Sequence, residues 1–208
     1  MYTDSHVHIH NRNQGVRMGK YSVVIIAGTT RKQRKSIHAA RFVEQIGKQI
    51  EDVEITFIDP AEFNLPGDGN DPEAKDPNYS EITRKADAFY IVVPEYNHSF
   101  PGSLKRLLDS ELENYIHKPV TLAGVSAGVF GGARAIEALL SPLREMGMVV
   151  TFSDVYFMHS YDLFNENGEI ADDKKEDYEK RIKEAYDELL WMAKLLKYGR
   201  EELTNKGE

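Results

Sequence analysis

The stretch Pro-Glu-Tyr-Asn-His-Ser-Phe-Pro-Gly, at positions 94–102, is the most informative part of this sequence. It follows a short apolar run, residues 88–93, and precedes a segment of helical character, residues 103–109. The apolar run predicts a buried strand, so a polar and aromatic turn stands at the carboxyl end of that strand. In an open α/β sheet, ligands bind in the crevice outside the carboxyl ends of the strands. This turn is therefore the first candidate for a functional site.

Two further loops hold the same position after an apolar run. Residues 28–36 follow the run 21–27 and carry hydroxyl groups and four cations where a helix is expected to start. Unpaired N–H groups and the helix dipole favour an anion there, so this loop suits a phosphate, although a solvated helix start is the alternative. Residues 126–132 follow the run 120–125. Their glycines allow close approach of a flat ligand, or tight packing of the next helix.

Apolar periodicity predicts strands and helices in alternation along the chain. Strands are expected at 21–27, 53–58, 88–93, 120–125 and 148–152, and helices at 33–50, 79–85, 103–114, 131–146 and 176–198. This alternation predicts a parallel sheet. We expect an α/β fold of flavodoxin-like type, a doubly wound five-stranded parallel sheet of order 2-1-3-4-5 with helices on both faces. In that order the first and third strands meet at the switch point, where flavodoxin binds FMN.

Size and charge restrict the function. The 208 residues, 41% of them hydrophobic, can bury one good core. We expect a single domain over 20–200, a disordered leader or tag-like extension at 1–19 and a flexible tail at 201–208. The net charge of −8 argues against nucleic-acid binding, and the absence of cysteine excludes disulfides and thiolate chemistry. No apolar run approaches the ~20 residues that span a bilayer, so we expect no membrane partner and a cytoplasmic location.

A histidine-rich stretch near the start, Thr-Asp-Ser-His-Val-His-Ile-His at 3–10, superficially matches the Asp-x-His-x-His opening of metal-dependent hydrolases with a barrel fold. Such a barrel needs about 250 residues and further ligands from later strands. The sequence offers neither. We therefore expect no metal site and interpret the stretch as part of the leader.

Three motifs together resemble the NADPH-dependent FMN reductase family, which includes related quinone, azo-dye and chromate reductases. They are Gly-Thr-Thr-Arg at 28–31, the 94–102 stretch continued by Ser-Leu-Lys, and Ser-Ala-Gly-Val-Phe-Gly-Gly-Ala-Arg at 126–134. The resemblance implies that the first loop wraps the FMN phosphate, that the second lies along the isoalloxazine ring, and that the third flanks the ring. The residues so implicated are Thr29, Thr30, Arg31, Arg34 and Ser36 in the first loop, Pro94, Glu95, Tyr96 and Asn97 in the second, and Ser126, Ala127, Gly128, Val129 and Phe130 in the third.

The same resemblance implies an NAD(P)H-dependent FMN reductase or quinone-type reductase. Hydride would pass from a nicotinamide through bound FMN to a small-molecule electron acceptor: a quinone, a free flavin, an azo compound or a metal oxyanion. No Gly-x-Gly-x-x-Gly fingerprint is present, so NADPH or NADH is expected as a transient co-substrate docking over the ring. Loop N–H groups would stabilise charge on the reduced flavin, and we assign no catalytic side chain. The family tends to form homodimers or homotetramers.

Two other functions fit the sequence less well. A flavodoxin-like electron carrier or interaction protein would bind FMN, or nothing, without turnover of NAD(P)H. A hydrolase using Ser126 would need His and Asp partners, and Ser126 lacks the Gly-x-Ser-x-Gly elbow. For a reductase, we expect the acceptor site to be built by the long loop at 59–78 and by residues 98–100.

Overall fold

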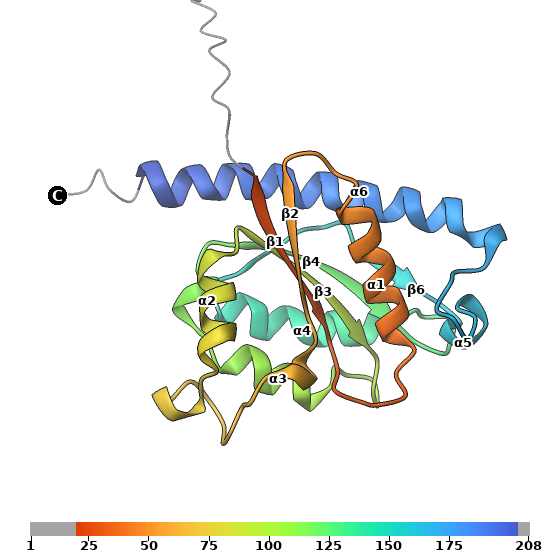
Figure 1. Cartoon of the computed structure of the whole chain (residues 1–208), viewed down its shortest axis with the longest axis horizontal. Helices are drawn as coiled ribbons and strands as arrows, with labels where there is room; N and C mark the ends of the chain where they lie inside the picture. The colour runs from red at the N-terminus through yellow and green to blue at the C-terminus, as the bar shows by residue number, and fades with distance from the viewer. Residues whose placement is uncertain (1–19, 204–208) are drawn as a thin grey trace, which may run out of the picture.

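A computed structural model describes residues 20–203; the predicted leader with its histidine-rich stretch, and residues 204–208 of the predicted tail, lie outside the described residues. The centre of the fold is a parallel sheet of order β2-β1-β3-β4-β5, with β6 also paired to β4 (Figure 1). The predicted strand order is therefore confirmed. The strands are β1 (Tyr21–Ala27), β2 (Val53–Ile58), β3 (Ala88–Pro94), β4 (Pro119–Val125), β5 (Val149–Val150) and β6 (Val155–Phe157).

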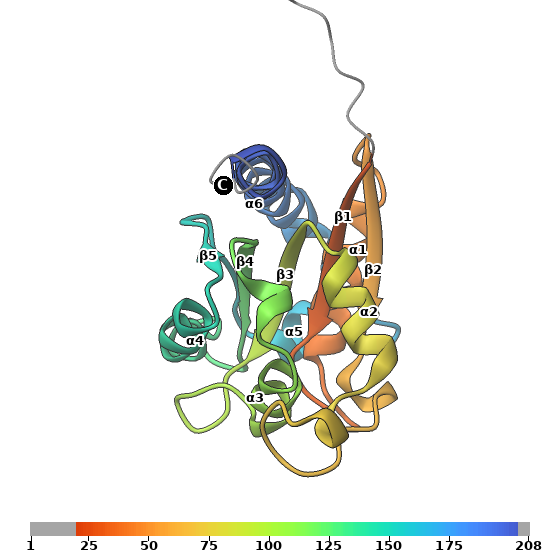
Figure 2. The ribbon, with the colours of Figure 1, turned by 90° about the vertical axis from the view of Figure 1, so that its left-hand side faces the viewer.

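Helices cover both faces of the sheet, as expected for a doubly wound fold (Figure 2). One face carries α1 (Ser36–Gly47) and α6 (Asp172–Tyr198), and the other carries α2 (Pro77–Lys85), α3 (Gly102–Asp109) and α4 (Ala133–Glu145). Shorter elements are η1 (Pro60–Glu62), η2 (Pro72–Ala74), η3 (Glu113–Tyr115), α5 (Ser160–Leu163) and the π-helical turn η4 (Gly199–Leu203), which reaches into the predicted tail. Between residues 20 and 203, no helix combines the length and the apolar character needed to cross a bilayer.

The central strands are apolar on both faces because helices cover both. Every residue of β3 and of β4 is buried, and along β1 only Ser22 is partly exposed. Alternate side chains of β1 enter opposite cores: Val23 and Ile25 pack towards α1 and α6, while Val24 and Ile26 pack towards the other helices. Continuous apolar runs of this kind are typical of parallel strands buried on both sides, which explains why the sequence predicted them well.

The fifth strand differs from the prediction. The expected strand 148–152 is present only as β5, and the edge of the sheet continues as β6 after an interruption at 151–154. The register shows the cause: β4 pairs Val120 with Val150 but Ala123 with Val155, so the edge segment holds two more residues than β4 between these pairs. The extra residues bulge outward, and Phe152 is 83% exposed. The sheet therefore has six strands in five positions.

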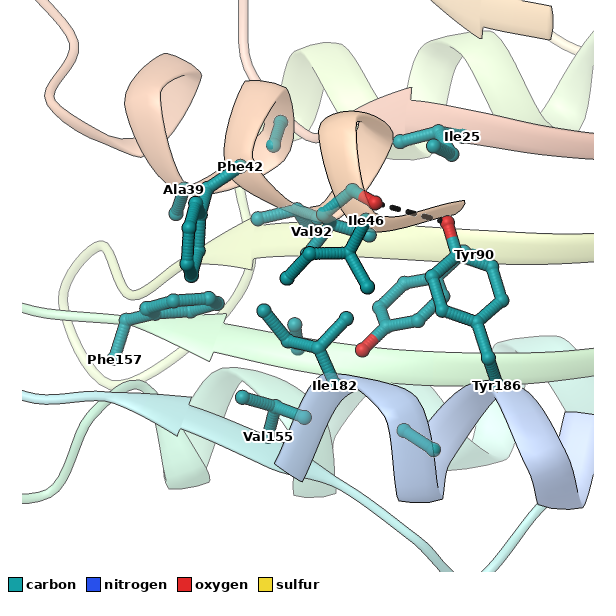
Figure 3. Close-up of a cluster of buried hydrophobic side chains, with 14 of the residues drawn as sticks. Ile25, Ala39, Phe42, Ile46, Tyr90, Val92, Val155, Phe157, Ile182 and Tyr186 are labelled. Atoms are coloured by element: carbon teal, nitrogen blue, oxygen red, sulfur yellow. Dashed lines mark hydrogen bonds between the residues drawn. The ribbon is translucent and has the colours of Figure 1, made fainter. Parts of the chain in front are cut away.

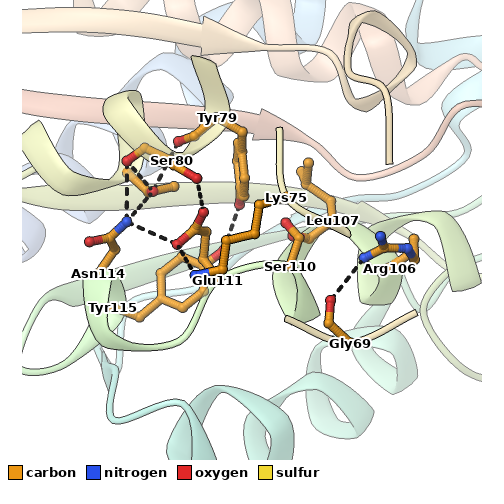
Figure 4. Close-up of polar contacts among 11 residues, drawn as sticks. Gly69, Lys75, Tyr79, Ser80, Arg106, Leu107, Ser110, Glu111, Asn114 and Tyr115 are labelled. Atoms are coloured by element: carbon orange, nitrogen blue, oxygen red, sulfur yellow. Dashed lines mark hydrogen bonds and ion pairs between the residues drawn. The ribbon is translucent and has the colours of Figure 1, made fainter. Parts of the chain in front are cut away.

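The predicted helix 103–114 is also shorter in the structure. It ends as α3 at Asp109, and the Ser110 hydroxyl donates to the carbonyl of Leu107 at 2.7 Å. Glu111 then turns into a buried polar cluster, where it accepts hydrogen bonds from Ser80 and from Asn114 (Figure 4). A buried carboxylate needs such partners, and this requirement ends the helix. Conversely, α6 starts at Asp172, four residues before the predicted start.

Helix α6 is fixed to α1 through Tyr186, whose buried hydroxyl donates to the Val43 carbonyl at 3.1 Å (Figure 3). The Tyr186 ring also lies 5.1 Å from that of Tyr90 on β3. This contact requires a glycine at position 47, because a methyl group there would lie 2.7 Å from Tyr186 Cζ and 2.9 Å from Ile55 Cδ1. The absence of a side chain at Gly47 thus allows the two helices to share one core.

We predict that Gly47→Ala lowers the free energy of unfolding by about 1–3 kcal/mol, because the added methyl overpacks the Tyr186 contact. Gly102→Ala is the matched control, since a methyl group at Gly102 meets no atom within 4 Å. The control should leave stability unchanged or slightly raised. Urea unfolding followed by circular dichroism measures both, and equal stability of the two variants would contradict the assigned role of Gly47.

Candidate functional site

The three predicted loops meet at the carboxyl edge of the sheet around a cavity of about 210 Å³, which we call the flavin cavity because the strand order predicts a flavin site at this position. Of the predicted site residues, those that line it are Arg31, Arg34, Ser36, Pro94, Glu95, Tyr96, Ser126 and Ala127. Those that do not are Thr29, Thr30, Asn97, Gly128, Val129 and Phe130. The cavity lies at the β1/β3 switch point, as the strand order requires.

Thr29 and Thr30 connect the first loop to the second instead of facing the cavity. The buried Thr29 hydroxyl donates to the Tyr96 hydroxyl at 3.3 Å and accepts from the Arg31 N–H at 3.3 Å. The Thr30 N–H donates to the Ser103 hydroxyl at 3.3 Å. These bonds hold the backbone of the first loop in place. The two threonines therefore fix the shape of the cavity without lining it.

The first loop ends at an uncapped helix N-terminus. Ser36 begins α1, and Lys35 before it provides no side-chain cap. Within residues 20–203, the backbone N–H groups of residues 32–35 find no hydrogen-bond acceptor. Such orphan donors, together with the positive end of the helix dipole, form an anion site. The exposed side chain of Arg31 adds positive charge beside it.

Arg34 has a partner that the sequence did not predict. Its guanidinium forms an ion pair with Asp59, the first residue after β2, and donates from Nη1 to the Arg31 carbonyl at 2.9 Å. The Arg34 side chain is only 11% exposed, and its buried Nε has no hydrogen-bond partner among the described residues. Arg34 therefore connects the first loop to the residue that follows β2, and Asp59 compensates its charge.

The second loop is a tight hairpin turn. Tyr96 and Ser99 exchange two backbone hydrogen bonds, of 2.8 and 3.0 Å, around Asn97 (φ 51°) and His98 (φ 63°). A two-residue hairpin with two left-handed residues favours asparagine at its first central position. The Glu95 N–H also has an acceptor, the Val125 carbonyl at 2.9 Å. Most of the N–H groups that we expected to face a ligand therefore donate to carbonyls of the chain itself. Asn97 is one of the two left-handed residues that form the turn.

The third loop contacts the second through an ion pair. Glu95 accepts from Arg134 at 3.0 Å, and the Arg134 guanidinium lies 4.4 Å from the centre of the exposed Phe130 ring. Gly132 starts α4 with φ 90°, and a methyl group there would lie 2.7 Å from the Gly124 carbonyl carbon. Gly132 therefore permits tight packing on β4. Gly128, in contrast, has open space where a side chain would start, so packing does not require a glycine there.

The cavity has wall residues that the sequence analysis did not single out as site residues. Gln33, Lys35 and Val125 belong to the predicted loops or their flanking strand, whereas Ser160 and Tyr161 come from α5. These last two follow the carboxyl end of β6, so the rule that found the other loops applies to them as well. They were missed because the fifth strand was expected to end at Phe152. The long loop at 59–78, expected at the acceptor site, does not line this cavity.

That loop is attached elsewhere, by Arg106 of α3 (Figure 4). Its guanidinium donates to the carbonyls of Pro66 and Ala74, both at 2.9 Å, and to that of Gly69 at 3.3 Å. These three bonds to main-chain carbonyls hold the loop against α3, although η1 and η2 are its only helical turns before α2. Arg106 is therefore a main anchor of this loop.

We predict that Asn97→Val lowers the free energy of unfolding by about 1–2 kcal/mol, because a β-branched residue is strained in the left-handed region. Asn97→Gly is the matched variant and should stay within a few tenths of a kcal/mol of the parent, since glycine adopts this conformation readily. Both are measured by chemical denaturation. If valine and glycine behaved alike, the hairpin turn would not constrain this position.

Comparison with known proteins adds to this geometry. The family model described as NADPH-dependent FMN reductase matches residues 21–162. A quinone reductase of Pseudomonas putida is 29% identical over 163 residues, covering 73% of this chain and 86% of the relative. An NADPH azoreductase of a Bacillus species is 30% identical over 123 residues, covering 58% and 67%.

Among solved structures, the flavoenzyme NAD(P)H:acceptor oxidoreductase FerB from Paracoccus denitrificans superposes with a TM-score of 0.67. At 21% identity, covering 83% of this chain and 98% of that protein, this likeness shows the shared flavodoxin-like fold. The segment that the family model matches contains all three cavity loops and also Ser160 and Tyr161 of α5. The chain therefore belongs to the NADPH-dependent FMN reductase family and is an oxidoreductase that uses FMN and NAD(P)H.

Proposed function

We propose that the protein transfers hydride from NAD(P)H, by way of FMN held in the flavin cavity, to a small acceptor such as a quinone, a free flavin, an azo compound or a metal oxyanion. The observation that carries this proposal is the flavin cavity itself, which joins an uncapped cationic helix start to the second and third loops at the β1/β3 switch point. Relatives named as quinone reductase and NADPH azoreductase support acceptors of this kind.

The first loop fits a flavin phosphate. We assign the phosphate to the orphan N–H groups of residues 32–35, with Arg31 and Ser36 beside it. Arg34, paired with Asp59, adds a positive charge next to the loop. Thr29 and Thr30 hold the loop backbone in place. The donor set is thus a helix N-terminus surrounded by cations, which is the usual protein site for a phosphate.

The other two loops fit a flat ring system. We assign Pro94, Glu95 and Tyr96 to one side of the ring, with Asn97 at the turn, and Ser126 and Ala127 to the other side, with Gly128 to Phe130 following them outside the cavity lining. Bound FMN supplies the redox chemistry, accepting a hydride and passing electrons to the acceptor. The chain supplies position: the Glu95–Arg134 ion pair and the Tyr96–Ser99 turn keep the walls of the cavity fixed.

No side chain in the flavin cavity is needed as a proton donor or acceptor for hydride transfer itself. The free Asn97 N–H can donate to the ring, since no described residue accepts from it. Val129 and Phe130, which follow the lining residues Ser126 and Ala127, are exposed, so a partner subunit or an acceptor can cover them. A homodimer or homotetramer, a cytoplasmic location and a single domain over 20–200 stay predictions.

The decisive experiment is an anaerobic absorbance spectrum of the protein after incubation with FMN and desalting, followed by NADPH and then NADH. We expect retained yellow colour that bleaches on addition of a reduced nicotinamide and returns with a quinone. Retained colour without bleaching would instead indicate an electron carrier. If no flavin is retained, steady turnover with excess FMN would identify FMN as an exchanging substrate, and lack of turnover would refute the proposal.

We predict that Asp59→Asn weakens FMN binding about tenfold, because the buried guanidinium of Arg34 loses its counter-charge and no longer braces the loop. Riboflavin has the same ring without the phosphate, so its affinity should stay unchanged. Fluorescence quenching of each flavin on titration with protein measures both constants. Asp76→Asn is the control: it removes the same charge at the N-cap of α2, outside the cavity lining, while the amide oxygen can still accept from the helix N–H groups. Equal effects on FMN and riboflavin would exclude a role at the phosphate.

A further inference from the structure

A second cavity, of about 700 Å³, lies beside the flavin cavity. One flank of α1 and the segment between α5 and α6 form it, and we call it the hairpin cavity because residues 164–170 of that segment fold back on themselves. Tyr161 lines both cavities and is 61% exposed. The volume lies within the range of about 300–1,000 Å³ that is usual for small-molecule sites.

The hairpin that walls this cavity is well anchored. Phe164 and Ile170 pair at its base and are 1% and 7% exposed. Asn165 and Glu169 exchange hydrogen bonds of 2.8–3.0 Å across the turn. Its tip packs against α1, where a methyl group on Gly168 would lie 2.9 Å from Cε1 of His38. The cavity therefore has fixed walls, as a binding site requires.

The side chains that line the hairpin cavity favour a polar ligand group that carries little negative charge. Asp162, Glu169 and Asp172 contribute carboxylates, whereas the cations are Lys175 and Arg41. Arg41 is already paired with Glu44 at 2.8 Å, which leaves the cavity acidic on balance. The amides of Gln45, Asn165 and Asn167 offer both donors and acceptors. Carboxylates and amides together suit the hydroxyl groups of a ribose, and they disfavour a phosphate.

A cation lies next to both cavities along α1. Lys35 lines the flavin cavity, and its carbonyl accepts at 3.1 Å from the N–H of His38, which lines the hairpin cavity. A ligand that extends from one cavity into the other would therefore pass Lys35 and Tyr161. A phosphate bridge is the linker that Lys35 would stabilise, and an exposed tyrosine ring can stack on a base.

We propose that the hairpin cavity holds the adenosine of a dinucleotide, either FAD with its flavin half in the flavin cavity or a nicotinamide donor that reaches the FMN bound there, and that its carboxylates favour a free ribose 2′-hydroxyl over a 2′-phosphate. An acidic residue that accepts from the ribose 2′-hydroxyl makes the same distinction in dinucleotide-binding folds. The inference rests on the proposed function. Adenosine of this kind occurs in a nicotinamide donor and in the adenylate half of FAD, and both present the same chemistry to the cavity.

The first test is calorimetric titration of the FMN-loaded protein with 5′-AMP and with adenosine 2′,5′-bisphosphate. We expect 5′-AMP to bind and the bisphosphate to bind about tenfold more weakly, a difference of about 1.4 kcal/mol. Absence of 5′-AMP binding at millimolar concentration, or tighter binding of the bisphosphate, would overturn the proposal. FMN retention and bleaching by NADH in the same preparation report on the proposed function separately.

The second test fills the cavity. Gln45→Trp, on the exposed flank of α1, should raise the dissociation constant for 5′-AMP about tenfold and leave that for FMN unchanged. Gln49→Trp, just beyond α1 and outside the lining, is the matched control. Asn167→Trp on the hairpin fills the same space if the α1 variant is unstable. Unchanged 5′-AMP affinity in a folded filled variant would refute the proposal.

The filled variant also identifies the source of the adenosine. A raised KM for NADH with an unchanged KM for reduced nicotinamide mononucleotide, which lacks adenosine, would assign the site to the donor. Loss of FAD binding without any change in either KM would assign it to the adenylate half of FAD. Both results support the adenosine site, whereas wild-type values for all three quantities would contradict it.

Discussion

Hydrogen bonds of the parallel sheet continue beyond the strands into the loops, and the site depends on this continuation. The Gly28 N–H donates to Val92 at 2.8 Å, that of Glu95 to Val125 at 2.9 Å, and that of Ser126 to Phe157 at 3.1 Å. Each bond joins a loop to the end of the next strand in the sheet. Because backbone groups must be paired where water is excluded, these contacts fix the loops in the same register as the core. The sheet therefore determines the shape of the flavin cavity.

Ion pairs between side chains then hold together the loops that the backbone has positioned. Arg34 and Asp59 place a compensated charge beside the first loop, and Glu95 and Arg134 connect the second and third loops. Neither pair is fully exposed, so solvent screens their attraction less than it would at the surface. The orphan N–H groups at the start of α1 are left free for an anion. The site thus combines rigid walls with one end whose donors lack partners inside the chain.

The sequence was sufficient for the central sheet because strands buried on both faces are continuous apolar runs, as in β3 and β4. It was insufficient at the edge, where Ser153 and Asp154 interrupt the apolar pattern although β6 resumes at Val155. That error hid Ser160 and Tyr161, which line the cavity. Pairing of Arg34 with Asp59 was also beyond the sequence, because it depends on the β1–β2 register that sets Ile26 beside Ile58.

The outward bulge at 151–154 also bears on how the molecule avoids association through its sheet. An open sheet edge exposes unpaired N–H and C=O groups that can recruit a strand from another molecule. Here the edge is divided into pieces of two and three residues, β5 and β6. A visiting strand would find too few consecutive groups for a continuous ladder. The irregularity that obscured the fifth strand in the sequence therefore protects this edge of the sheet, the one opposite β2, against pairing with another molecule.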